Sequence, residues 1–147
     1  MMDFSKFDSM VDVEGLKADI EKAATGQGEY VEVPHGTYEV KVTKLKLDES
    51  KKGDPMVRVF FKIVRGEYEN SMVFMNQVVL KGFQFHIVNE LLRSMGTGID
   101  IHFESYSKYA ELLEDVFAAI DGQKEFALEY GENKGFNTFK ITDVFNI

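Results

Sequence analysis

The sequence predicts a mainly β domain with helices, of the α+β class, and three observations support this. Alternation of apolar and polar residues from Val31 to about residue 80 indicates three consecutive strands. Helical spacing follows, over about residues 83–121, and a predicted β-hairpin comes last. Three strands, a helical crossover and two strands are the order expected for the five-stranded OB barrel. We therefore predict an OB-fold barrel with two helices between strands 3 and 4, the crossover plugging one end.

The chain divides into an N-terminal segment and the predicted domain. Residues 1–30 carry a short amphipathic pattern that ends at the glycines of Gly26-Gln-Gly28. We expect an N-terminal helical extension there, either packed on the domain or serving as a partner-binding arm. Residues 31–147 are the predicted OB-fold domain, because a chain of 147 residues can bury one substantial core.

The first predicted strand changes phase in its middle. Val40 and Val42 share one face, but Leu45 can join them only if the alternation slips near residues 43–44. Such a slip indicates a β-bulge, which bends a strand so that it can serve two sheets of a small barrel. A polar turn over residues 48–55 leads into the second strand.

The second predicted strand, residues 56–65, has one apolar face and one unusual face. The unusual face sets the ring of Phe60 between Arg58 and Lys62, on the side that normally meets solvent. A ring flanked by cations suits single-stranded nucleic acid, because bases stack on the ring and phosphates meet the cations. The other interpretation is a ring covered by a loop or helix beside ordinary surface charges. The third strand, about residues 70–80, is apolar on both faces.

Two helices and a hairpin complete the predicted domain. Both helices are expected to face the core, and each ends at a glycine, Gly96 or Gly122. A hairpin follows, with strands at residues 126–130 and 136–141 and a turn at residues 131–135. The expected core residues of the helices are Phe83, Ile87, Val88, Leu91, Leu92 and Met95 in the first, and Tyr109, Leu112, Leu113, Val116, Phe117 and Ile120 in the second.

Charge is distributed unevenly along the chain. The formal net charge of −8 argues against nucleic-acid binding, which needs local positive potential. Residues 41–65 nevertheless hold eight Lys/Arg and three Asp/Glu, a net charge of +5, so the remainder carries −13. Screening confines charge effects to about 10 Å, so this basic segment can act locally. The alternative is that these lysines serve solubility on exposed strands.

The basic segment coincides with the binding face expected for an OB barrel. That face uses strands 2 and 3 with the loops joining strands 1 to 2 and 4 to 5. We therefore predict single-stranded DNA binding with little sequence preference, in which cations neutralise phosphates and rings stack bases. The predicted binding residues are Lys41, Lys44, Lys51, Lys52, Arg58, Phe60, Lys62, Phe74, Lys134 and Phe136.

Four stretches also carry a likeness to a known family. They read Val-Pro-His-Gly-Thr-Tyr-Glu-Val (33–40), Ser-Lys-Lys-Gly-Asp-Pro-Met (50–56), Phe-Met-Asn-Gln (74–77), and Glu-Tyr-Gly-Glu with Gly-Phe-Asn-Thr-Phe-Lys (129–132 and 135–140). The chain resembles small tailed-phage proteins from Gram-positive hosts, a family of unknown function often called phage single-stranded DNA-binding proteins. The resemblance implies a role in phage DNA replication or recombination, with a phage recombinase, helicase or polymerase as partner.

The sequence offers little for catalysis. It has no cysteine, three histidines far apart in the chain, no phosphate-binding loop and no nucleophile elbow. We expect a non-enzymatic protein without cofactor or metal. No apolar run approaches the roughly 18 residues that cross a bilayer, and no signal peptide is present, which predicts no membrane association and a cytoplasmic location, the host cytoplasm if the protein is phage-encoded.

The acidic part of the chain suggests an alternative function. The protein would then be an interaction module that binds a replication or host protein, presenting its negative helices to a basic partner or mimicking DNA. Strand edges and the N-terminal segment could also pair two copies, so the sequence is compatible with a homodimer and leaves the oligomeric state open.

Overall fold

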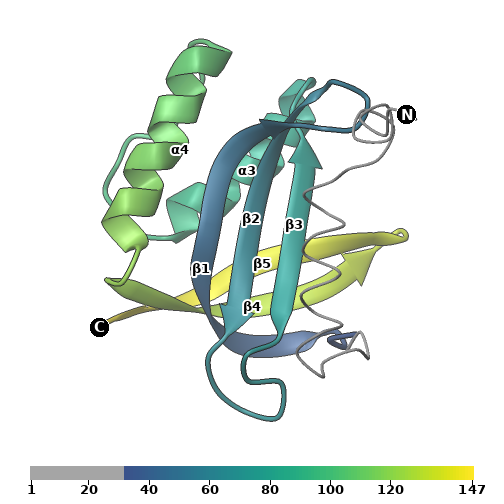
Figure 1. The fold of residues 1–147 in the computed structure, drawn as a ribbon, viewed down its shortest axis with the longest axis vertical. Coiled ribbons are helices and arrows are strands. Elements are labelled where there is room, and N and C mark those ends of the chain that lie inside the picture. The colour runs from purple at the N-terminus through teal and green to yellow at the C-terminus, as the bar shows by residue number, and fades with distance from the viewer. Residues whose placement is uncertain (1–31) are drawn as a thin grey trace, which may run out of the picture. The chain divides into compact units, whose positions relative to one another are not determined.

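A computed structural model describes residues 32–147 (Figure 1). The predicted helical extension, residues 1–30, lies outside the described residues. In chain order the elements are β1 (Gly36–Glu49), β2 (Pro55–Ile63), β3 (Met72–Val78), α3 (Gly82–Ser94), α4 (Tyr106–Ile120), β4 (Lys124–Asn133) and β5 (Phe136–Asn146). Together Val33–Ile147 make one unit.

The five strands form one open antiparallel sheet in the order β3-β2-β1-β4-β5. The predicted OB barrel is therefore wrong. Closing it would require pairing of β3 with β5, and these strands stand at opposite ends of the sheet. β5 instead crosses the inner side of β2, where the rings of Phe61 and Phe139 stack with centroids 6.1 Å apart. The two helices follow β3 along the chain, but no closed barrel exists for them to plug.

β1 is long and bent, and it links the two layers visible in Figure 1. Its residues 36–40 pair with β4, and its residues 40–49 pair with β2. A register shift between Val42 and Lys44 leaves Thr43 as a bulge, which confirms the predicted slip.

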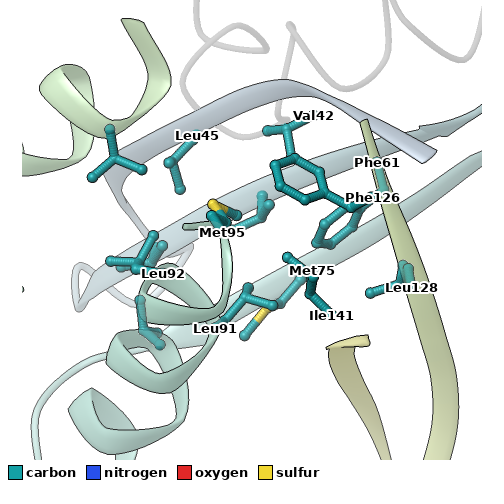
Figure 2. Packing of buried hydrophobic residues seen from close by; sticks show 14 of the residues in the cluster. Val42, Leu45, Phe61, Met75, Leu91, Leu92, Met95, Phe126, Leu128 and Ile141 are labelled. Atoms are coloured by element: carbon teal, nitrogen blue, oxygen red, sulfur yellow. The ribbon is translucent and has the colours of Figure 1, made fainter. Parts of the chain in front are cut away.

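The core lies between the inner face of β1–β3, the β4–β5 hairpin and the two helices. Figure 2 shows Leu91 and Leu92 of α3 in one cluster with Phe61 of β2 and Phe126 of β4. The predicted alternation of β2 is confirmed, because its four core-facing side chains are fully buried: Val57, Val59, Phe61 and Ile63.

Both helices begin at side-chain caps. The Gln84 Oε1 atom accepts hydrogen bonds from the backbone N–H groups of Leu80 and Lys81, at 2.8 and 2.9 Å. The Ser105 hydroxyl accepts one from the backbone N–H of Lys108 at 3.2 Å. In the part of the chain that the structure describes, neither helix is long and apolar enough to cross a membrane.

Most of the predicted helical core is confirmed, with two exceptions on α3. Phe83 and Ile87 were expected to be buried, and both are exposed. The inner side of α3 instead runs through Val88, Leu91 and Leu92. Apolar spacing alone could not show which part of this surface is buried, because the apolar residues form one continuous stripe over about half of the helix circumference.

The β4–β5 hairpin is tighter than predicted. Its turn consists of Lys134 and Gly135, whose φ angles of 52° and 82° are typical of a type I′ turn. The residues expected in a longer turn, 131–133, continue β4 and pair with β5.

Candidate nucleic-acid interface

The side of β1, β2 and β3 that faces away from the core gathers six of the ten predicted binding residues. Antiparallel register sets residues of neighbouring strands side by side in rows. We call this surface the β1–β3 outer face, and its rows are Lys41, Lys62 and Met72; Lys44, Phe60 and Phe74; Lys46, Arg58 and Asn76; and Asp48, Met56 and Val78. Cations therefore lie in three consecutive rows, with a pair of rings in the middle one.

The bulge in β1 is what brings Lys44 to this face. Val40 and Val42 point into the core, and strict alternation would send residue 44 there as well. The extra residue, Thr43, shifts the phase and sets Lys44 opposite Phe60. The Lys44 Nζ atom lies 4.8 Å from the centre of the Phe60 ring, a cation–π contact that contributes about 0.5–1 kcal/mol at exposed sites.

Phe60 and Phe74 form an edge-to-face pair. Their ring centroids are 4.8 Å apart and their planes meet at 81°. Both rings are partly exposed. Successive rows on one face of a strand are about 7 Å apart, so the cations of the neighbouring rows flank the rings on both sides. This spacing allows one base to stack while its phosphates meet cations.

Asp48 offsets part of this positive charge. Its Oδ2 atom lies 3.3 Å from Lys46 Nζ and 3.4 Å from Arg58 Nε. The backbone N–H of Glu49 donates to the same carboxylate at 2.8 Å, and this hydrogen bond, with the interactions of Lys46 and Arg58, lowers the pKa of Asp48 despite its partial desolvation. Asp48 is thus ionised at neutral pH and competes with any phosphate for both cations.

Sequence reasoning left Lys46 and Asp48 out of the predicted site. The signal was available, because alternation after the slip sends residues 44, 46 and 48 to one face. The ion pair itself could not be found in this way, since it joins Asp48 to Arg58 across two strands.

Lys51 and Lys52 lie in the turn at one end of the β1–β3 outer face. The turn is held by Ser50, whose carbonyl accepts from the Gly53 N–H at 2.9 Å and whose hydroxyl accepts from the Asp54 N–H at 3.0 Å. Both lysine side chains are exposed. They extend the basic surface beyond the row of Asp48.

Lys134 and Phe136 do not belong to this face. They lie at the tip of the β4–β5 hairpin, which pairs with β1 only through residues 36–40. In the view of Figure 1 this tip extends past the edge of β3. Because the sheet is open, the hairpin does not flank the outer face as a closed OB barrel would require.

Arg65, which belongs to the basic segment of the sequence, has a structural role. Its guanidinium lies 2.9 Å from Glu39 of β1 and 3.2 Å from Glu125 of β4. It therefore joins the end of β2 to two neighbouring strands and is not part of the β1–β3 outer face.

Comparison with known proteins identifies the family. Residues 19–139 match the model of a family described as a protein of unknown function, DUF669. The chain belongs to the DUF669 family. The DUF669 match covers the whole β1–β3 outer face and both described helices. No curated protein matches the chain.

The histidines of this DUF669 chain lie apart from the β1–β3 outer face. His35 Nε2 is 3.1 Å from the side-chain oxygen of Asn137, and His102 lies 3.2 Å from both Asp100 and Glu104. Within residues 32–147, no group of three or more His, Cys, Asp or Glu side chains could hold a metal ion.

Proposed function

We propose that this DUF669 protein binds single-stranded DNA on the β1–β3 outer face with little sequence preference. The observation that supports this best is the row of Lys44, Phe60 and Phe74, set between two rows of cations. Every base has a face that can stack on a ring, so stacking contributes about 1–3 kcal/mol per base for any sequence.

The charge of the face supports the same proposal. Five cations and Asp48 give it a net charge of +4, although the chain as a whole carries −8. Fields of this kind act over about 10 Å or less in physiological salt, so a strand lying on the face meets the local charge. A duplex keeps its bases stacked inside and can use only the charges, so the rings favour single strands.

We further propose that this activity serves phage DNA replication or recombination in the host cytoplasm. The support is the resemblance of residues 33–40, 50–56, 74–77 and 129–140 to small tailed-phage proteins. A recombinase, helicase or polymerase of the phage would be the protein partner.

Fluorescence anisotropy tests the DNA proposal. A labelled oligo-dT of about 30 nucleotides exceeds the roughly 4–16 nucleotides covered by comparable single-strand-binding domains, and it is titrated at several salt concentrations with a matching duplex as control. We expect submicromolar binding to the single strand, with a slope of about −3 in log K against log salt, because about four phosphates are neutralised at 0.7 each. Absence of binding at low salt, or equal binding of the duplex, would refute the proposal.

A further inference from the structure

The starts of α3 and α4 expose a group of large apolar side chains. Leu80, Phe83 and Ile87 are 52%, 63% and 44% exposed, and Phe103 and Tyr106 are 41% and 39% exposed. These five residues, which we call the α3–α4 apolar patch, include all but two of the exposed large apolar side chains in the described part of the chain. Apolar surface concentrated in this way marks interaction sites, whereas scattered single residues do not.

Contacts between the two helix starts set the patch in one place. The Tyr106 hydroxyl donates to the backbone carbonyl of Val79 at 2.9 Å, next to Leu80. The ring of Phe85 lies 4.6 Å from Phe103 and 6.0 Å from Tyr106, measured between centroids. These contacts pre-organise the aromatic side chains, so little side-chain entropy would be lost when a partner binds.

Phe83 and Ile87 extend the patch along α3. They are four residues apart, so their side chains lie one above the other on the same side of the helix. This side borders the one that packs into the core through Val88, Leu91 and Leu92. An amphipathic helix that lies along Phe83 and Ile87 would contact an exposed apolar side chain at each of two successive turns of α3.

An acidic rim lies next to the patch. Residues 100–121 hold six Asp/Glu and one Lys. Glu104 directly follows Phe103 and lines a surface pocket of about 240 Å³ on α4, together with His102, Lys108, Glu111, Leu112 and Asp115. The one lysine is already paired, since its Nζ atom lies 2.9 Å from Glu104. The outer side of α4 therefore carries an excess of negative charge, and it adjoins the patch where Glu104 follows Phe103.

We propose that the α3–α4 apolar patch and the acidic rim of α4 bind a basic amphipathic helix of a partner protein. Apolar residues of that helix would cover Phe83, Ile87 and Phe103, and its Lys and Arg residues would face Glu111 and Asp115. A second copy is a poor occupant, because a two-fold interface would oppose two acidic α4 surfaces on chains that each carry −8. Nucleic acid and anionic lipid are repelled by the same charge.

Peptide binding to the full-length protein tests this proposal. The probe is a labelled peptide of about 18 residues, roughly five helical turns, built from Leu and Lys with Leu on one side. A peptide of the same composition in scrambled order has the same charge without the apolar side. We expect the amphipathic peptide to bind at least about tenfold more tightly than the scrambled one, and Phe83→Ser with Ile87→Ser to remove that difference.

Matched variants make the test specific. Phe136→Ser changes another exposed ring, on the β4–β5 hairpin, and should leave peptide binding unchanged. Glu111→Gln with Asp115→Asn should weaken binding several-fold at low salt and little at high salt. Oligo-dT binding of the Phe83→Ser, Ile87→Ser variant should equal that of the wild type, which separates this surface from the β1–β3 outer face.

Three results would overturn the proposal. One is equal affinity for the amphipathic and scrambled peptides, and another is peptide binding that survives Phe83→Ser with Ile87→Ser. The third is concentration-dependent self-association in analytical ultracentrifugation that these substitutions abolish, which would assign the patch to a second copy of the chain.

Discussion

At the scale of single residues, Phe60 is the side chain on which the proposed DNA binding depends most. Its ring contacts Lys44 and Phe74 and is partly exposed in the middle row of the β1–β3 outer face. Phe60→Ala should weaken oligo-dT binding by about 1–3 kcal/mol with the fold intact, as measured by anisotropy and circular dichroism. Phe60→Leu keeps apolar bulk without a ring and should lose nearly as much. A change below about 0.3 kcal/mol, well under the stacking range, would remove Phe60 from the site.

Asp48 provides an opposite prediction at the same scale. Asp48→Asn releases Lys46 and Arg58, so DNA binding should strengthen about two- to fivefold, equivalent to about 0.5–1 kcal/mol. The slope of log K against log salt should become steeper by about 0.7. Glu49→Gln removes the same charge from the neighbouring residue and is the control. Weaker binding of Asp48→Asn would show that Asp48 supports the site by holding Arg58 in place.

The same substitution should affect stability in a pH-dependent manner. The pKa of Asp48 is lowered in the folded protein, so its contribution is present above the usual pKa of an aspartate and is lost as pH falls through the lowered value. Asp48→Asn should therefore reduce the free energy of unfolding at neutral pH, and the difference from wild type should disappear in strong acid. Urea unfolding at several pH values measures this. If the difference in the free energy of unfolding between Asp48→Asn and the wild type stays constant with pH, changed packing and not the lost carboxylate charge accounts for it.

At the scale of elements, the β1–β2 turn can be tested as part of the basic surface. Lys51 and Lys52 are exposed at the end of the β1–β3 outer face. Lys51→Ala with Lys52→Ala should flatten the slope of log K against log salt by about 0.7 for each phosphate that the variant no longer neutralises. The matched control is Lys134→Ala, on the separate β4–β5 turn. An unchanged slope in the double variant would show that the β1–β2 turn does not bind phosphate.

The β4–β5 turn depends on backbone conformation. Gly135 has a φ of +82°, and a Cβ atom added there would meet no other atom within 4 Å. Gly135→Ala should therefore cost about 1–2 kcal/mol of stability through strain alone. Gly82→Ala also adds a methyl group in open space, but in α3, and should be neutral or slightly stabilising. Equal stability of the two variants, measured by urea unfolding, would contradict the type I′ assignment.

At the scale of the whole molecule, charge and apolar surface are divided between two regions. The β1–β3 outer face is basic and aromatic, and the α3–α4 apolar patch adjoins an acidic rim. The two regions share no residue, so combining Phe60→Ala with Phe83→Ser should give additive effects on oligo-dT and peptide binding, within about 0.5 kcal/mol. A coupling well above this value would show that DNA and partner binding are linked.

Much of the candidate interface could be predicted from sequence, because strand alternation is local. Residues two apart share a face, and the slip near Thr43 could be read from where apolar residues change phase. Lys44 and Phe60 can therefore be assigned to outward faces of their strands without knowledge of how the strands pair. The ion pair of Asp48 with Arg58 was missed, since it depends on register between strands.

The sequence by itself determined the order of the described elements, the bulge in β1 and six residues of the β1–β3 outer face. Only the tertiary structure decided that the sheet stays open and that Phe83 and Ile87 remain at the surface. The physical reason is the distance along the chain over which each feature is determined. Periodicity shows which residues of one element share a side, whereas strand pairing and the choice of buried helix side depend on contacts between elements far apart in the chain.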